Sequence, residues 1–212
     1  MKSTTQRLII FITKKQSKMG LNQSQNKGVF LSITNGKLVR QFASPTEKSV
    51  SRVNKMGREV HEEFYDSLSG WLTDLKTKES EYGKFWVITI KDENVYYNLE
   101  CKYDSGYAMS FLKALPNADL SEVITLTPKL IVDGDKKQSV LFISQNGGGL
   151  KHYWTKADPK ELPDLQKIKV KGKETWDSTN RLEYLEDYVK LSILPKIKPT
   201  LSDVTEGEDT PF

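Results

Sequence analysis

The stretch Phe85-Trp86-Val87-Ile88-Thr89-Ile90 decides the fold, because an unbroken run of aromatic and β-branched residues is typical of a β-strand. Asp92-Glu93-Asn94 has the composition of a turn, and Val95–Cys101 is a second run of the same kind. Upstream, Gly70–Lys76 is also strand-like and is followed by turn residues from Glu79 to Lys84. The sequence therefore predicts a three-stranded meander.

The spacing of apolar residues changes directly after this meander. Four of them lie at positions i, i+3, i+4 and i+7, which predicts one face of an α-helix: Ala108, Phe111, Leu112 and Leu115. Asp104 or Ser105 can cap the start of this helix, and Pro116-Asn117 ends it.

Strands are expected again after the helix. The first covers Glu122–Thr127 and extends toward Val132, and the second covers Ser139–Ser144. A glycine-rich turn at 146–149 then leads into Leu150–Trp154. Three strands, one helix and two strands is the order of the OB-fold, a five-stranded Greek-key barrel with its helix between strands 3 and 4. We expect this mainly β fold, and a different meander-and-helix α+β domain is the alternative.

The flanking segments predict a division of the chain into four parts. Asn35-Gly36 separates two β-rich runs and predicts a hairpin over 28–42, and 43–56 has the polar composition of a linker or binding loop. Near the other end, a helix is expected at about 179–192, with Leu182, Leu185, Val189 and Ile193 on one face. The parts are a basic arm (1–27), an OB-fold domain with its hairpin (28–155), a basic loop and helix (156–197) and a disordered acidic tail (198–212).

Composition excludes several classes of function. Cys101, His61 and His152 are the only cysteine and histidines, so we expect no disulfide, no metal and no cofactor. No phosphate-binding loop or nucleophile elbow is present, which argues against an enzyme. No apolar run is long enough to span a membrane, and we expect a cytoplasmic protein without a membrane partner.

Charge is distributed unevenly along the chain. Residues 1–55 contain 11 lysines and arginines and one acid, whereas 199–212 contain four acids and no base. A basic segment of this kind favours a polyanionic partner. Single-stranded nucleic acids are bound by aromatic side chains that stack on bases and by lysines that pair with phosphates, so a binding site would combine both residue types on one face of the meander.

Strand alternation predicts that Phe85 and Tyr96 face outward if Trp86, Ile88 and Ile90 face the core. We expect some of the following aromatic residues, but not all of them, to stack on bases, with the lysines lying beside them. The candidate nucleic-acid-binding residues are Trp71, Lys76, Lys78, Tyr82, Lys84, Phe85, Tyr96, Lys102, Tyr103, Lys151, Tyr153 and Trp154.

The acidic tail reads Glu208-Asp209-Thr210-Pro211-Phe212. An aromatic ring behind a proline and acids is suited to an apolar pocket with a basic rim on a partner protein. The tail resembles the acidic tip of bacterial single-stranded DNA-binding proteins. In addition, 65–71, 82–88 and 103–107 are similar to single-stranded DNA-binding proteins of tailed bacteriophages, notably crAss-like ones.

The resemblance implies a protein that binds single-stranded DNA without sequence preference during replication, recombination and repair. It further implies that Glu208, Asp209, Pro211 and Phe212 recruit replication and repair proteins, and that the protein acts in the host cytoplasm if a phage encodes it. The basic arm and the 155–195 extension have no counterpart in the short bacterial domain, so a monomer and a homo-oligomer both stay open. Strand annealing or recombination mediation, and single-stranded RNA binding, are the alternative functions.

Overall fold

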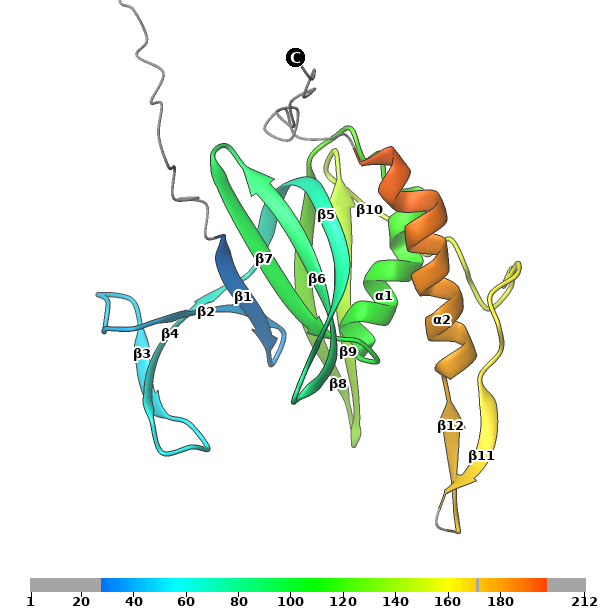
Figure 1. The fold of residues 1–212 in the computed structure, drawn as a ribbon, viewed down its shortest axis with the longest axis horizontal. Helices are drawn as coiled ribbons and strands as arrows, with labels where there is room; N and C mark the ends of the chain where they lie inside the picture. The colour runs from blue at the N-terminus through cyan, green and yellow to red at the C-terminus, as the bar shows by residue number, and fades with distance from the viewer. Residues whose placement is uncertain (1–27, 171, 198–212) are drawn as a thin grey trace, which may run out of the picture.

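The structure, a computed structural model, describes residues 28–170 and 172–197. This part of the chain is mainly β, as the sequence predicts, with one large mixed sheet and a separate two-stranded sheet (Figure 1). The strands are β1 (Val29–Thr34), β2 (Lys37–Phe42), β3 (Val50–Val53), β4 (Glu59–Tyr65), β5 (Leu68–Ser80), β6 (Gly83–Asp92), β7 (Val95–Lys102), β8 (Ile124–Asp133), β9 (Lys136–Gln145), β10 (Gly148–Gly149), β11 (Gln166–Val170) and β12 (Lys173–Asp177). The helices are α1 (Gly106–Ala114), α2 (Thr179–Tyr188), the 3-10 turns η1 (Leu115–Asn117) and η3 (Leu194–Lys196), and the π-helical turn η2 (Val189–Ile193).

The large sheet has the strand order β10-β9-β8-β5-β6-β7-β1-β2-β4-β3. The predicted meander is confirmed as β5-β6-β7, and the hairpin β8-β9 follows α1. The start of β5 pairs with β8, whereas its longer remainder pairs with β6. One long strand therefore joins the meander to the β8-β9 hairpin.

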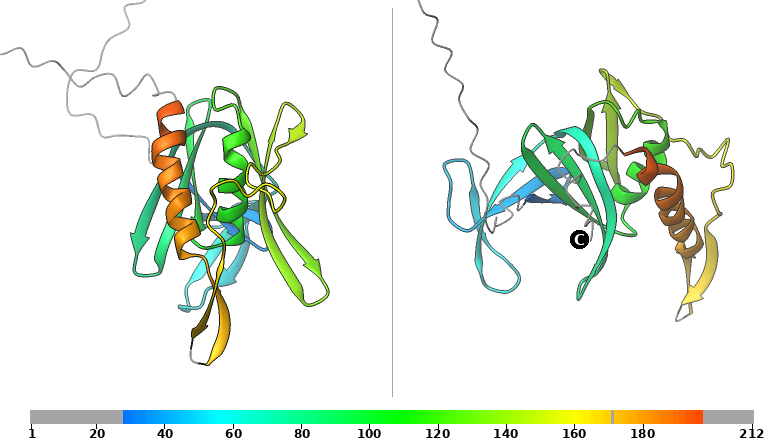
Figure 2. Two further views of the ribbon diagram at one scale, coloured as in Figure 1. Left: turned by 90° about the vertical axis from the view of Figure 1, so that its right-hand side faces the viewer. Right: turned by 45° about the horizontal axis from the view of Figure 1, so that its top comes forward.

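The strand count and the closure differ from those of a five-stranded barrel. The described structure pairs the free edge of β7 with β1, in parallel, instead of with the last strand of a barrel. From β1 the sheet continues through β2 to β4 and β3. Strands β2, β4 and β3 curve away from the meander (Figures 1 and 2). We call these three strands the arm, which is distinct from the basic segment 1–27.

Both predicted helices are present. Ser105 caps α1 by accepting a hydrogen bond from the backbone N–H of Ala108 at 3.2 Å. The four apolar residues that define the inner face of α2 and η2 are buried, as expected. The two helices lie next to each other (Figures 1 and 2) and share one hydrophobic core with the meander.

The Asn-Gly hairpin is also confirmed. Asn35 and Gly36 have φ values of 50° and 77°, the left-handed conformation that a two-residue hairpin turn requires. The backbone N–H of Gly36 donates a hydrogen bond to the hydroxyl of Tyr107 at 3.0 Å, which fixes the turn against α1.

Two local predictions are wrong. Residues 50–53 are not a linker, because β3 pairs with β4 over its whole length. Residues 166–170 are not a loop but pair with β12. In the described residues, no helix has the length and apolar character needed to cross a bilayer.

Gly70 stands where β5 changes its pairing partner from β8 to β6. A Cβ atom at this position would lie 2.4 Å from the carbonyl oxygen of Lys91, and φ is +156°. We therefore expect Gly70→Ala to lower the free energy of unfolding by about 1–3 kcal/mol, measured by chemical denaturation.

Gly149→Ala is the matched control, because nothing lies within 4 Å of a Cβ atom there. It should differ from wild type by less than about 0.5 kcal/mol. Equal stability of Gly70→Ala and Gly149→Ala would show that the close approach of β5 to β6 is not a constraint.

Candidate nucleic-acid interface

The meander has one sealed face and one open face. Side chains alternate along a strand, and the inward members of β6 and β7 are buried: Trp86, Ile88, Ile90, Leu99 and Cys101. The opposite side chains of β5, β6 and β7 form a surface that we call the outer face. It includes six of the predicted residues: Trp71, Lys76, Lys78, Phe85, Tyr96 and Lys102.

A β-bulge in β5 keeps its inward and outward side chains aligned with those of β6. The register shifts between Leu72 and Asp74, so that Thr73 is an extra residue without a partner on β6. Leu72 and Leu75 are three residues apart, yet both are buried in the core. As a result, Trp71 on one side of the bulge and Lys76 on the other share the outer face.

One end of the outer face combines two aromatic rings with a lysine. Trp71 lies opposite Lys91 on β6, which lies opposite Tyr96 on β7. The Nζ atom of Lys91 is 5.5 Å from the centroid of the Tyr96 ring. Trp71 is 45% exposed, so the indole is open to a planar ligand. Sequence reasoning missed Lys91 because it directly precedes the turn at 92–94.

The other end places Phe85 between two lysines. Lys78 and Lys102 lie on either side of Phe85 in the register of β5, β6 and β7. Lys78 pairs with Glu100 at 2.9 Å, and Lys76 pairs with Asp74 at 2.8 Å. Exposed ion pairs of this kind are weak, so these lysines can exchange a carboxylate for a phosphate.

The middle of the outer face is polar and closely packed. Thr89 donates a hydrogen bond to the side-chain oxygen of Asn98 at 2.9 Å, and Thr89 and Val87 are buried among their neighbours. Phe30 on β1 lies opposite Asn98 and is 60% exposed, which extends the aromatic surface beyond β7. Alternation of buried and exposed residues in β1 was the signal that could have found Phe30.

Trp154, one of the candidate residues, is only 1% exposed, so its ring is not available to stack on a base. It packs against Tyr188 at a centroid distance of 4.9 Å and against Tyr153 at 5.0 Å. Tyr153 is partly buried in the same aromatic cluster, which holds α2 against the loop. Lys151 is exposed but lies on this loop, outside the outer face.

Lys84 and Tyr103 are also placed away from the outer face. The Tyr103 ring stacks on Trp86 at 5.6 Å, and its hydroxyl donates a hydrogen bond to Glu186 of α2 at 2.7 Å. Lys84 pairs with the same carboxylate at 2.5 Å and lies 4.2 Å from the Tyr103 ring. These two residues attach α2 to the meander. Tyr82, by contrast, is 68% exposed at the tip of the β5-β6 turn.

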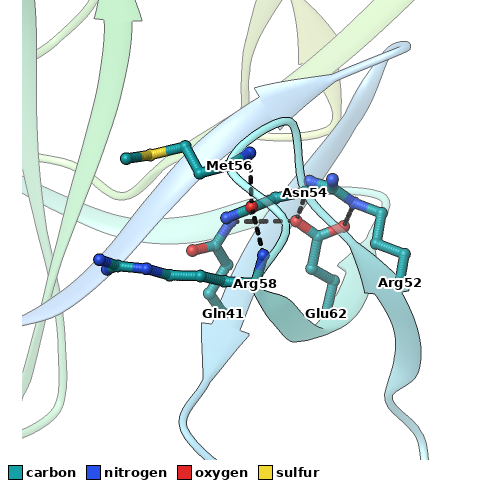
Figure 3. Close-up of polar contacts among 6 residues, drawn as sticks. All are labelled: Gln41, Arg52, Asn54, Met56, Arg58 and Glu62. Atoms are coloured by element: carbon teal, nitrogen blue, oxygen red, sulfur yellow. Dashed lines mark hydrogen bonds and ion pairs between the residues drawn. The ribbon is translucent and has the colours of Figure 1, made fainter.

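The arm carries an ion pair between the buried carboxylate of Glu62 and the half-exposed side chain of Arg52 (Figure 3). Glu62 accepts two hydrogen bonds from Arg52, each 2.7 Å long, and a third from Gln41 at 3.0 Å. The contact with Arg52 is the main reason why the pKa of Glu62 lies below its usual value. The ion pair of Arg52 on β3 with Glu62 on β4 therefore links the two strands. The side chains of Met56 and Arg58 extend together away from this pair (Figure 3).

Several predicted features lie outside the described residues or carry no ligand chemistry. Glu208, Asp209, Pro211 and Phe212 fall in the part that the structure does not describe, as does the basic arm 1–27. Within 28–170 and 172–197, no group of three or more His, Cys, Asp or Glu side chains is arranged to hold a metal. Burial raises the pKa of the Cys101 thiol to about 12, so it stays protonated at neutral pH.

Comparison of the chain with models of known protein families, with curated proteins and with solved structures found no match.

Glu186 provides a test of how α2 is held. Burial raises the pKa of Glu186, but hydrogen bonds from Lys84, Tyr103 and Lys190 outweigh this effect and hold it at about 2. A carboxylate with a lowered pKa contributes stability above its unfolded value, and this contribution is lost as the pH falls toward the folded value. We expect Glu186→Gln to lose on the order of 2 kcal/mol at pH 7 in urea denaturation, and the difference from wild type should vanish between pH 4.5 and about 2.

Glu183→Gln is the control, because Glu183 is an exposed residue of the same helix for which the described structure shows no ion pair or hydrogen bond, and its free energy of unfolding at pH 7 should stay close to that of wild type. A pH-independent deficit in Glu186→Gln would show that packing, and not the charge of Glu186, attaches α2.

Proposed function

We propose that this protein binds single-stranded DNA without sequence preference, across the outer face of β5, β6 and β7. The observation that carries the proposal is the placement of three rings, one exposed and two partly exposed, and of lysines in register on the side of the sheet opposite the core. Trp71, Phe85 and Tyr96 supply the rings, and Lys91 and Lys102 lie directly beside them.

The chemistry of these residues fits an unpaired strand. Every base has a π-face, so stacking on an aromatic ring tolerates any sequence and contributes about 1–3 kcal/mol per base. Lysines pair with phosphates, which every nucleotide carries. In a duplex the bases are already stacked on each other, and rings on an open sheet have no access to their faces.

The chain connectivity supports a relation to the OB-fold. A three-stranded meander is followed by α1 and then by the β8-β9 hairpin, which pairs back to the first strand of the meander. OB-folds bind oligonucleotides on the face of their second and third strands, which correspond here to β6 and β7. We infer an OB-related arrangement in which β1 takes the edge of β7.

A groove continues the outer face toward the arm. Its lining includes Phe30 and Ser32 of β1, Gln41 of β2 and Glu100 of β7. Phe30 projects from β1 opposite Asn98, so single-stranded DNA that extends beyond the ring of Tyr96 meets a further ring, which is exposed. The groove therefore gives the bound DNA a direction across the sheet from β7 to β1.

Recruitment of replication and repair proteins through Glu208, Asp209, Pro211 and Phe212 is part of the same proposal and rests on sequence alone. RNA is the alternative ligand, because rings and lysines bind either backbone and discrimination depends on contacts with the 2′-hydroxyl.

We expect full-length protein to bind a labelled oligo-dT of about 15 nucleotides, with affinity that falls steeply with salt. Trp71→Ala should weaken binding by about fivefold to a hundredfold, which corresponds to one lost stack. Fluorescence anisotropy measures both effects, and an oligo-U of equal length distinguishes DNA from RNA.

Phe142→Ala is the matched control, since Phe142 is exposed to the same extent, 45%, but lies on β9. It should bind like wild type. Equal affinity for single-stranded and duplex DNA, or equal losses in Trp71→Ala and Phe142→Ala, would refute binding by stacking on the outer face.

A further inference from the structure

The β11-β12 hairpin stands apart from the body of the protein. Its strands pair only with each other, and nine of their ten residues are exposed. It projects beyond α2 in every view (Figures 1 and 2). A lone two-stranded hairpin is marginally stable in water, so its structure is not explained by core packing.

Four of the nine exposed side chains of this hairpin are basic or aromatic. Lys167 and Lys169 alternate along β11, and Lys173 begins β12. Trp176 lies opposite Lys167 and is 60% exposed, although the Nζ atom of Lys167 is 5.3 Å from its ring centroid. The ion pair between Lys167 and Glu174 is long, 3.4 Å, and both of its side chains are exposed.

The hairpin adjoins the outer face through a shared hollow. Tyr82 of the β5-β6 turn, Lys102 of β7 and Trp176 of β12 all line this hollow. Lys102 also flanks Phe85 on the outer face. A nucleic-acid strand that extends beyond the Phe85 end of the outer face therefore reaches Tyr82 and Trp176 next, and then the lysines of the hairpin.

The charges of the hollow determine which part of a nucleotide it can accept. Asp177 accepts hydrogen bonds from the backbone N–H and the hydroxyl of Thr179, and Glu186 is neutralised by Lys84. Asp104 and Glu183 also line the hollow, which disfavours a phosphate there. The exposed rings of Tyr82 and Trp176 suit a base instead, while the phosphates fall along the hairpin.

We propose that Tyr82, Trp176 and the β11-β12 lysines form a second contact segment for the same single strand of nucleic acid. This inference rests on the proposed function. Bases stack in the hollow on Tyr82 and Trp176, and Lys167, Lys169 and Lys173 pair with the backbone beyond it. The second segment lengthens the bound site and has no role in binding oligonucleotides that only cover the outer face.

The test compares two lengths of oligo-dT, about 8 and about 24 nucleotides, with full-length protein. Trp176→Ala should weaken binding of the longer one about fivefold or more and leave the shorter one unchanged. Trp176→Phe should restore most of the loss. Joint replacement of Lys167, Lys169 and Lys173 by Ala should reduce the salt slope for the longer oligonucleotide by about 2, since each single-strand phosphate contact contributes about 0.7.

Joint replacement of Lys129, Lys136 and Lys137 by Ala is the control, because it removes the same charge from the β8-β9 hairpin. It should leave binding of both lengths unchanged. The inference is overturned if the hairpin variants bind the longer oligonucleotide like wild type, if the control loses as much, or if both lengths lose equally. If wild type binds no single strand, with DNA or with oligo-U, the proposed function fails and this inference fails with it.

Discussion

The sealing of one side of β6 is the constraint on which the rest of the structure depends. Trp86, Ile88 and Ile90 point into the core, and strict alternation then sends Phe85 and Lys91 to the other side. A slip of one residue would exchange the two faces. The bulge at Thr73 extends the same division to β5. The position of the rings on the outer face is thus a consequence of how the core is packed.

The core also determines where the C-terminal extension lies. Trp86 is buried beneath the Tyr103 ring, and Tyr103 with Lys84 holds Glu186 of α2. The β11-β12 hairpin is joined directly to the start of α2, so the direction of α2 sets the direction of the hairpin. Two surfaces far apart in sequence are in this way oriented by one group of contacts around Trp86.

Local sequence was sufficient for elements whose stability is local. The β6-β7 hairpin, the Ser105-capped helix α1 and the Asn35-Gly36 turn could all be predicted, because periodicity and turn chemistry encode them. The pairing of β7 with β1 and the strand β3 could not, since they depend on residues distant in the chain. For the same reason the sequence does not distinguish Trp71 from Trp154, because Trp154 is buried by contacts with Tyr153 and with Tyr188 of α2, which is distant in the chain.

The ion pairs of the protein differ in how much free energy is lost when they are broken. Lys84 and Arg52 each hold a carboxylate that is largely shielded from water, and removing either would leave a buried charge. Lys76 and Lys78 pair with carboxylates on an open surface, where such pairs contribute less than about 1 kcal/mol. Under the proposed function, a polyanion would displace Asp74 and Glu100 without breaking the contacts of Lys84 and Arg52. The lysines proposed for binding and the cations that hold α2 and β3 in place are therefore different residues.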